Sequence, residues 1–525
     1  MADLATRLDP RILGVDRNDI FIPFRECTPK ILVVTDGLNY AAAQPFGLSQ
    51  FVSSLTSATI HGMTPTVVKA SRGGSPGADI TNFNFTDATR GLDIKRYDVL
   101  FLFGIWAQGV SDLPEAERNV IARFMQAGGG VFATGDHETL GASLSSSVPR
   151  VRAMRKWVAT DTPPDRANTS RHSTNWSGSN ESEEFADQSD AIPQRLYVNY
   201  RTLGNGIFQP DFERLAHPVL QLPAPRKVVE VFPDHPHEGE CVIPAAFNTS
   251  FKVDGQVAQE WPSTFFLPPR PELAAYSMSH GDGFENGNPD KSGLVPKCFG
   301  AIATYNGQRA GVGRVVTDAT WHHFVNINLD GSGSGQSALR PGGVDSEEMT
   351  RIRQYYVNLA TWLMPKNVRR CLFVLQALDA MARFPLYEEL QGAAAPKFDA
   401  DVARTLGRSL LAALRQDQPA WIAEALADDA LTDALGEKAR ARLEEPAVQA
   451  TLGAFTVDLA HAAVGGMLAS MIGDLNTMKS LKEIRPHESF VNGAVKGAAQ
   501  GVNLALAARR EQNARLDKLL SSEFK

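Results

Sequence analysis

Four short runs of β-branched and aromatic residues, separated by segments with helical spacing, constrain the fold of this chain more than any other feature. The runs are KILVVTDG (30–37), TPTVVKA (64–70), RYDVLFLFG (96–104) and GVFATGDHE (130–138). Helices are predicted around 47–60 and over 111–130, where apolar residues recur at three- and four-residue spacing. Strands that alternate with helices predict βαβ units, and therefore a mostly parallel sheet with helices on both faces.

Polar residues and glycines follow three of these strands. In open α/β sheets, ligands bind beyond the carboxyl ends of the strands. The ends here are Thr35–Asp36–Gly37, Gly104–Ile105–Trp106 and Gly135–Asp136–His137–Glu138. We therefore expect a site at this edge, with Asp36 and Trp106 among the side chains that contact a ligand.

Changes in composition along the 525 residues divide the chain into segments. A single hydrophobic core stops growing at about 250–300 residues, so more than one domain is expected. An α/β domain with a Ser-, Asn-, Pro- and Gly-rich insertion, expected to form long loops, precedes a Gly/Ser-rich linker and a helical domain. The expected bounds are an N-terminal arm at 1–27, the α/β domain at 28–328 with its insertion at 140–295, the linker at 329–345 and the helical domain at 346–525. Two further strand-like runs, 298–305 and 312–319, flank Asn306–Gly307 and predict a hairpin.

Charge and composition argue against several classes of protein. The formal net charge of -7 gives no basic footprint for nucleic acid. No continuous stretch reaches the roughly 20 apolar residues of a spanning helix, and the N-terminus lacks the pattern of a signal peptide. The four cysteines form no CxxC pair, which favours separate buried thiols in a reducing compartment. We therefore expect a cytoplasmic protein without a nucleic-acid or membrane partner.

Two segments of the helical domain, 461–475 and 490–510, are lined with small residues. The second carries Gly493, Gly497 and Gly501 on one stripe. Small residues at four-residue spacing let helix backbones approach closely. We expect tight helix packing or dimerisation, and a homo-oligomer formed through these C-terminal helices.

Histidines are concentrated in one part of the chain, since eight of the 11 lie between residues 137 and 323, several of them next to carboxylates. Imidazole is the side chain best suited to act as acid, base or metal ligand near neutral pH. Two clusters, GDHETLG (135–141) and TDATWHHF (317–324), follow predicted strands. The candidate catalytic residues are Asp136, His137, Glu138, His322 and His323. The candidate substrate-binding residues are Asp36, Trp106, Asp318 and Trp321. Adjacent histidines in extended chain point to opposite faces, so one of His322 and His323 can belong to the core.

A third cluster, FPDHPHEGE (232–240), suggests a metal site. His235 and His237 are separated by one residue, so an extended backbone directs both imidazoles to one side. Together with Glu238 they supply the nitrogen and oxygen ligands that zinc, manganese or iron accept. A structural hydrogen-bonding loop is the alternative.

The runs YDVLFLFG, FMQAGGGVFATGDHE, AHPVL and GVGRVVTDATWHHF, taken together, resemble the class I glutamine amidotransferase-like superfamily, especially its ThuA-like branch. The resemblance covers about residues 28–328. It implies a flavodoxin-like sheet with a site at its carboxyl edge, in which His137 and either His322 or His323 take the places of the branch's histidines. The elbow Thr134–Gly135–Asp136–His137 lacks the nucleophilic cysteine of the amidotransferases, which argues against Cys-dependent glutamine hydrolysis.

Three functions follow from these patterns, the last of which makes the glycine-striped helices a membrane-active effector. The first is a hydrolase-like enzyme for a polar small molecule, carbohydrate-related by analogy with the ThuA-like branch, in which a divalent metal activates water or polarises a substrate oxygen. The second is a non-catalytic α/β module that senses a ligand and is fused to a helical oligomerisation or effector domain.

Overall fold

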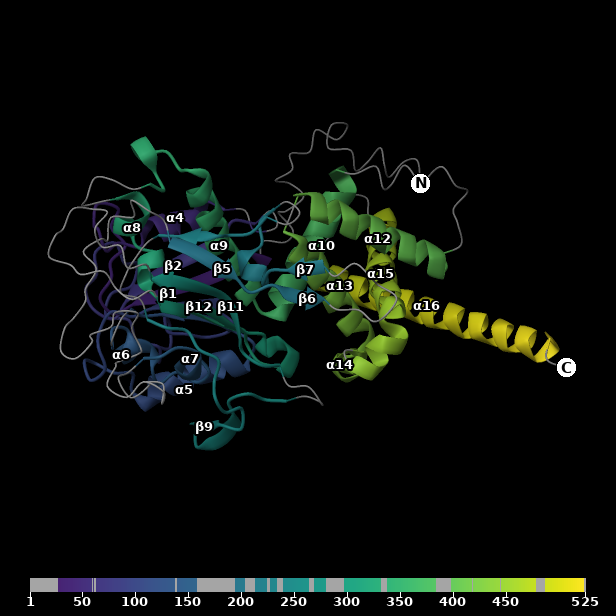
Figure 1. The fold of residues 1–525 in the computed structure, drawn as a ribbon, viewed down its shortest axis with the longest axis horizontal. Helices are drawn as coiled ribbons and strands as arrows, with labels where there is room; N and C mark the ends of the chain where they lie inside the picture. Colours follow the sequence, from purple (N-terminus) through teal and green to yellow (C-terminus); the bar gives the residue numbers. More distant parts are fainter. Residues whose placement is uncertain are drawn as a thin grey trace.

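The computed structural model describes residues 27–523, except 59, 61–62, 137–138, 158–193, 204–212, 224–226, 234–238, 264–268, 280–296, 332–337, 384–397, 418, 444 and 478–486. A body built around a β-sheet lies beside a body of helices, and the C-terminal helix projects away from both (Figure 1).

The central sheet has nine strands in the order β2-β1-β3-β4-β13-β12-β11-β5-β8. The first five run parallel to one another, and the last four are added antiparallel. The parallel strands are β1 (Lys30–Thr35), β2 (Thr66–Ser71), β3 (Val99–Phe103), β4 (Gly130–Thr134) and β13 (Val315–Asp318). The antiparallel strands are β5 (Gln194–Val198), β8 (Val231–Phe232), β11 (Glu272–Ser279) and β12 (Lys297–Tyr305). The expected α/β architecture, with a large mixed, mostly parallel sheet followed by helices, is confirmed.

Alternate residues of the buried strands enter two different cores. Phe101 and Phe103 of β3 pack on one face, whereas Leu100 and Leu102 pack on the other. Helices α4 (Ser49–Ser57) and α9 (Glu347–Leu363) cover the first face. Helices α5 (Glu115–Gln126), α6 (Ala142–Ser145) and α7 (Val151–Met154) cover the second (Figure 1). Because both faces are covered, the strands are apolar throughout rather than alternating.

Within the insertion at 140–295, the expectation of long loops is wrong for much of the described chain. Strands β5, β8 and β11 extend the central sheet. Two small hairpins add β6 (Arg201–Leu203) with β7 (Glu213–Leu215), and β9 (Ser250–Val253) with β10 (Gln256–Gln259). Except for β11, these strands have five residues or fewer, and those that join the central sheet pair with distant segments, so local patterns carry little signal for them.

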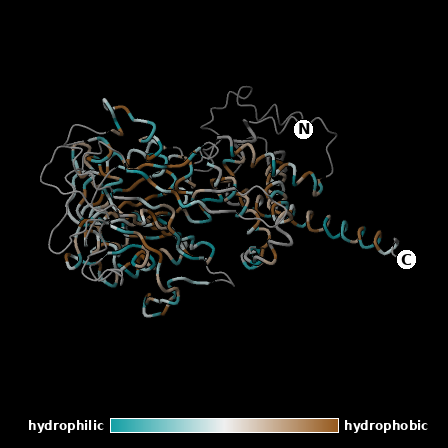
Figure 2. Tube along the Cα trace, in the orientation of Figure 1, coloured by the Kyte–Doolittle hydropathy of each residue, from teal (hydrophilic) through white to brown (hydrophobic). Residues whose placement is uncertain are grey.

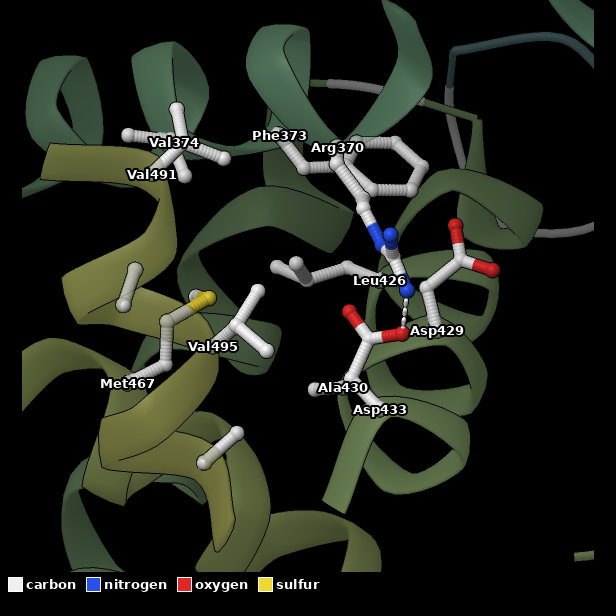
Figure 3. Close-up of a pocket in the computed structure, with 12 residues that line it drawn as sticks. Arg370, Phe373, Val374, Leu426, Asp429, Ala430, Asp433, Met467, Val491 and Val495 are labelled. Atoms are coloured by element: carbon white, nitrogen blue, oxygen red, sulfur yellow. Dashed lines mark hydrogen bonds and ion pairs between the residues drawn. The ribbon is translucent and has the colours of Figure 1, made fainter. Parts of the chain in front are cut away.

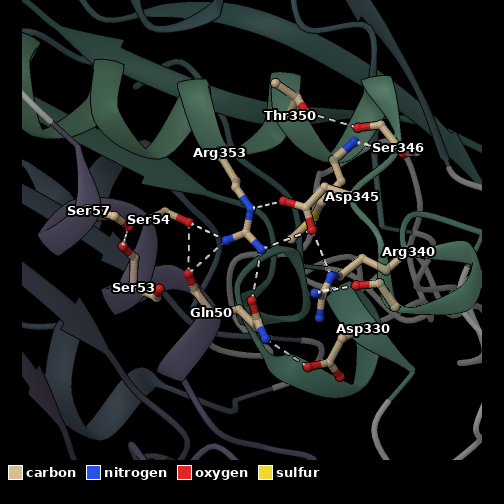
Figure 4. Close-up of polar contacts among 12 residues, drawn as sticks. Gln50, Ser53, Ser54, Ser57, Asp330, Arg340, Asp345, Ser346, Thr350 and Arg353 are labelled. Carbon is tan, nitrogen blue, oxygen red and sulfur yellow. Dashed lines mark hydrogen bonds and ion pairs between the residues drawn. The ribbon is translucent and has the colours of Figure 1, made fainter.

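Helix α9 belongs to the sheet body although it follows the expected boundary at residue 346. Its residues Met349, Ile352, Tyr355 and Tyr356 are fully buried in the same core as β1 and β3. Arg353 anchors this helix to α4 through Gln50 and the Ser54 hydroxyl, as Figure 4 shows. The linker region therefore connects α8 (Asn326–Asp330) to a helix on the same sheet.

The helical body comprises the helices after α9. They are α10 (Lys366–Arg383), α12 (Ala400–Asp417), α13 (Ala420–Leu435), α14 (Glu437–Leu443), α15 (Pro446–Thr477) and α16 (His487–Glu523). Arg370 of α10 pairs with Asp433 of α13 beside apolar side chains of α15 and α16 (Figure 3). The cavity there has a volume of about 20 Å³, which suits one water molecule.

The small residues of α15 and α16 serve helix packing within the chain. A side chain at Gly466 would collide with the backbone of Gly497 and Gly501, and one at Gly465 would collide with Ala403 of α12. The predicted close approach of the glycine-lined helices is thus present. By length and composition alone, Ala454–Ile472 of α15 could cross a membrane; half of this segment is buried against the rest of the protein.

The prediction that all four cysteines are separate thiols is wrong for one pair. Cys27, before β1, and Cys371, in α10, form a disulfide with their Cα atoms 5.9 Å apart. Their sequence separation of 344 residues explains why no local pattern revealed the pair. Cys241 is a buried free thiol and Cys298 an exposed one.

Candidate functional site

The carboxyl ends of four neighbouring parallel strands lie in one row. Thr35 of β1 is opposite Phe103 of β3, which is opposite Thr134 of β4, which is opposite Asp318 of β13. The segments that follow these residues therefore emerge at one edge of the sheet. Asp36, Trp106, Asp136 and the 319–323 segment all belong to this edge.

The central feature of this edge is a buried pair formed by Asp136 and His322. The Oδ2 atom of Asp136 lies 3.5 Å from Nε2 of His322, and both side chains are nearly inaccessible to solvent. Oδ1 of Asp136 accepts a hydrogen bond of 2.8 Å from the Thr320 hydroxyl. The Thr320 hydroxyl in turn accepts a hydrogen bond from the backbone nitrogen of His322, at 3.0 Å. One threonine therefore holds both members of the pair.

Asn328 of α8 orients the His322 ring. Its Oδ1 atom lies 2.6 Å from Nδ1 of His322. Because an amide oxygen only accepts hydrogen bonds, this contact places a proton on Nδ1 and directs Nε2 towards the Asp136 carboxylate. A histidine whose Nδ1 atom is held in this way can accept or donate a proton through its Nε2 atom.

His323 points in the opposite direction, into the core. Its Nδ1 atom lies 2.6 Å from Oδ1 of Asp318, and its ring packs on Phe232 at 4.3 Å. Tyr355 donates a hydrogen bond of 2.8 Å to the other Asp318 oxygen. Burial, and then the Asp318 carboxylate, raise the pKa of Tyr355 well above its ordinary value, so the hydroxyl stays protonated.

The two adjacent histidines therefore separate as expected, one at the edge and one in the core. His322 meets Asp136, whereas His323 and Asp318 join a fully buried network under α9. The sequence could not decide which histidine takes which place. The catalytic assignment of His323 and the substrate-binding assignment of Asp318 fall on residues that stabilise the core beneath the edge.

Asp36 occupies the point where the strand order reverses, between β1 and β3. Its Oδ1 atom accepts hydrogen bonds from the backbone nitrogens of Ile105 (2.6 Å) and Trp106 (3.3 Å). Its Oδ2 atom is buried and has no hydrogen-bond partner among the residues that the structure describes. Burial raises the pKa of Asp36 to about 6, although the two backbone hydrogen bonds oppose the rise.

Aromatic rings form a wall beside the Asp136–His322 pair. The Trp321 ring stacks on the His322 ring with their centroids 4.0 Å apart. Phe46, from the loop between β1 and α4, meets the edge of Trp321 at 5.7 Å and is 39% exposed. The Trp321 Nε1–H group is buried, and no described residue accepts a hydrogen bond from it.

Arg155 holds two strand ends together, and sequence reasoning missed it. Its buried guanidinium donates to the carbonyl oxygens of Asp136 (2.6 Å), Asp318 (3.1 Å) and Ala319 (2.7 Å). It also lies over the Trp157 ring at 4.4 Å. Residues 135–136 follow β4, and Ala319 follows Asp318, the last residue of β13, so this side chain fixes the spacing between the two loops of the edge. A single arginine after a short helix carries no motif that would have revealed this role.

Five of the predicted site residues cannot be placed. The expected catalytic residues His137 and Glu138 and the expected metal ligands His235, His237 and Glu238 lie outside the described residues. Within the described part of the chain, no group of three or more His, Cys, Asp or Glu side chains is arranged to hold a metal ion.

Comparison of the chain with protein-family models, with curated proteins and with solved structures gives no match. The site must therefore be interpreted from its own geometry.

Proposed function

We propose that this protein is a hydrolase-like enzyme for a polar small molecule, with Asp136 and His322 as its acid–base pair. The observation that supports this proposal most is the chain of contacts from Asn328 through His322 to Asp136. A fixed imidazole beside a buried carboxylate can take a proton from a nucleophile and return it to a leaving group. Thr320 and Arg155 act as positioning residues, because they touch the pair and its backbone.

The substrate proposal rests on the neighbours of this pair. A carboxylate with a spare acceptor, Asp36, and two indoles, Trp106 and Trp321, suit a molecule that presents hydroxyl groups and a partly apolar face. We therefore propose a carbohydrate-related substrate, in line with the ThuA-like resemblance. The order β2-β1-β3-β4-β13 supports the proposal of a flavodoxin-like sheet, in which ligands bind at the reversal point that Asp36 occupies.

The remaining expectations for the reaction rest on the sequence alone. His137 and Glu138 follow Asp136 directly and are proposed as further acid–base groups. His235, His237 and Glu238 are proposed as ligands of zinc, manganese or iron. Metal analysis of the purified protein tests this. Loss of a stoichiometric metal from the double variant H235A/H237A would support it, and an unchanged metal content would contradict it.

The acid–base proposal is tested by hydrolysis of a panel of chromogenic glycosides, esters and amides. We expect D136N and H322Q each to lower kcat/KM by about 10²–10⁴-fold, the usual contribution of acid–base catalysis. N328A should lower kcat more than it raises KM, since Asn328 acts through His322. D98N is the matched carboxylate control, because Asp98 precedes β3 at the opposite edge of the sheet. Equal activity of D136N, H322Q and the unmodified protein on every hydrolysed substrate would refute the proposal.

A second candidate function, assembly of a ligand-sensing module, is favoured by the outer part of α16. Residues 509–522 are all exposed and project from the molecule (Figure 1). In Figure 2 this stretch alternates hydrophilic and hydrophobic residues. Its exposed leucines, Leu516, Leu519 and Leu520, lie at the spacing of one helix face. An isolated helix of about 12–15 residues is marginal in water, so a partner surface would stabilise it.

We propose that this partner is a second copy of the chain, which makes the protein a homo-oligomer. Light scattering of the full-length protein tests the proposal. The triple variant L516S/L519S/L520S should convert an oligomer to a monomer, whereas R123Q, a surface control on α5, should not. A monomeric unmodified protein at high concentration would contradict it.

A cytoplasmic location and the absence of nucleic-acid and membrane partners also remain proposals. The disulfide between Cys27 and Cys371 argues against the reducing compartment that the cysteine spacing favours. Cell fractionation, combined with a count of free thiols, decides between a reducing compartment and one that permits the disulfide.

A further inference from the structure

A second cavity lies far from the carboxyl edge, between the sheet body and the helical body. Its volume is about 440 Å³, within the range of small-molecule sites. Arg314 and Trp362 line it from the sheet body, and Arg415, Trp421 and His461 line it from α12, α13 and α15. Because Arg314 directly precedes β13, the cavity lies at the amino edge of the sheet. It is therefore separate from the proposed acid–base site.

Arg314 is the most informative residue of this cavity. Its side chain is 6% exposed and lies over the Trp362 ring at 4.7 Å. Nε donates to Oδ1 of Asn306 at 3.0 Å, and Nη1 donates to the Trp362 carbonyl at 2.6 Å. Among the described residues, no carboxylate forms an ion pair with this guanidinium, and none accepts a hydrogen bond from Nη2.

A buried guanidinium that no carboxylate contacts directly is unfavourable, because burial removes its hydration. Burial, and then repulsion from Arg369, lower the pKa of Arg314 well below its ordinary value, and the more distant carboxylates of Asp429 and Asp428 offset only part of this effect. The protein therefore accepts a cost at this position that an anion in the cavity would offset.

The lining as a whole, Arg314 included, has an excess of positive charge. Four arginines face the cavity against two carboxylates, which belong to Glu424 and Asp428. Asp428 is already engaged by Arg440, whose Nε lies 2.7 Å from its Oδ1. Arg415 lines the cavity and is also exposed to solvent.

Two further polar atoms in the lining have no hydrogen-bond partner in the part of the chain that the structure describes. They are Nε1 of Trp421, a residue that is 2% exposed, and Nδ1 of His461. An indole nitrogen can only donate a hydrogen bond, so the unpaired Nε1 of this lining residue would be stabilised by a ligand acceptor that reaches it. Carboxylate and phosphate oxygens are such acceptors, and guanidinium groups bind both strongly.

We propose that this cavity binds a small molecule that carries an oxyanion group, a carboxylate or a phosphate. Arg314 Nη2 and Trp421 Nε1 donate to the anion, Arg415 adds long-range attraction, and the rings of Trp362 and Trp421 contact the apolar part of the ligand. Because the lining comes from both bodies, a bound ligand holds them together.

The test uses inorganic phosphate and citrate as separate probes, with sodium chloride at matched ionic strength as the reference. Binding to the full-length protein is followed by tryptophan fluorescence and by the midpoint of thermal unfolding. We expect a saturable change with at least one probe. R314M should weaken that binding about tenfold or more, since a charge-assisted hydrogen bond is lost. W421F, which removes only the indole donor, should weaken it by a smaller factor.

R123Q is the matched control, because Arg123 is an exposed arginine paired with Asp254 at the surface, outside this cavity. Its affinity for the probe should equal that of the unmodified protein. W421F also covers the case in which R314M fails to fold. A response that does not saturate, or one that is the same in the unmodified protein, W421F and R314M, would be general salt stabilisation and would overturn the proposal. A response to citrate but not to phosphate, or the reverse, would support it and identify the anion.

Discussion

Replacement of Asp36 by asparagine should make the protein more stable at neutral pH. The Asp36 carboxyl is 2% exposed, and burial raises its pKa from 3.8 to about 6. The rise corresponds to about 3 kcal/mol at 1.36 kcal/mol per pH unit. An acid whose pKa is raised by folding destabilises the folded state when it is ionised. This cost is therefore absent below pH 3.8, grows as the pH rises towards 6, and is complete above it.

D36N removes the charge but keeps an oxygen that can accept from Ile105 and Trp106. We expect the variant to gain about 3 kcal/mol over the unmodified protein between pH 4 and pH 7.5. Urea unfolding followed by tryptophan fluorescence across this range measures the difference. If the difference between the two proteins is the same at every pH, the carboxylate is not desolvated and the reasoning is refuted.

D98N is the matched control for the functional role of Asp36, because it should reproduce the stability effect at the opposite edge of the sheet. Asp98 is 8% exposed, accepts a hydrogen bond of 2.8 Å from the backbone nitrogen of Lys30, and burial raises its pKa to about 6 as well. The stability of both variants relative to the unmodified protein should therefore increase with rising pH. Only D36N should weaken hydrolysis or ligand binding, because only Asp36 lies at the carboxyl edge. Equal activity of D36N and D98N would show that Asp36 does not take part in hydrolysis or ligand binding.

Three further predictions concern the edge, the thiols and the helical body. R155M leaves the carbonyls of Asp136, Asp318 and Ala319 without their donor. The variant should lower the free energy of unfolding by about 3 kcal/mol or more in chemical denaturation. An unchanged denaturation midpoint would contradict the proposal that Arg155 holds the two strand ends together. A thiol-reactive dye should label only Cys298 in the native protein, because Cys241 is buried with its pKa raised to about 12 by that burial. It should label two cysteines after unfolding and four after reduction, whereas four without reduction would exclude the disulfide. G466V should separate α15 from α16 and lower the thermal midpoint. A508V, at a half-buried position of α16 just before its exposed part, should not lower it. Equal midpoints for both variants would show that the close contact adds no stability.

The two proposed sites lie at opposite edges of one sheet. The Asp136–His322 pair belongs to the carboxyl ends of the parallel strands, and the Arg314 cavity to the start of β13. β13 connects them directly, since Arg314 precedes this strand and Asp318 ends it.

The parallel half of the sheet could be predicted because its signals are local. The runs that became β1, β3 and β4 are continuous apolar stretches, and such stretches are required where helices cover both faces of a strand. The same pattern predicted that Asp36 and Asp136 would reach one edge, since parallel strands end at the same side. The close packing of α15 and α16 was also visible, because only glycine and other small residues permit it.

Tertiary structure alone decided the features that depend on contacts between distant residues. Which of His322 and His323 meets Asp136, the role of Asn328 and the clamp by Arg155 all follow from side-chain positions that no local period encodes. The same holds for the antiparallel strands of the insertion, for the disulfide between Cys27 and Cys371, and for the attachment of α9 to the sheet. Local sequence determines which segments can be strands or helices, whereas a site of buried polar groups exists only once separate segments exclude water together.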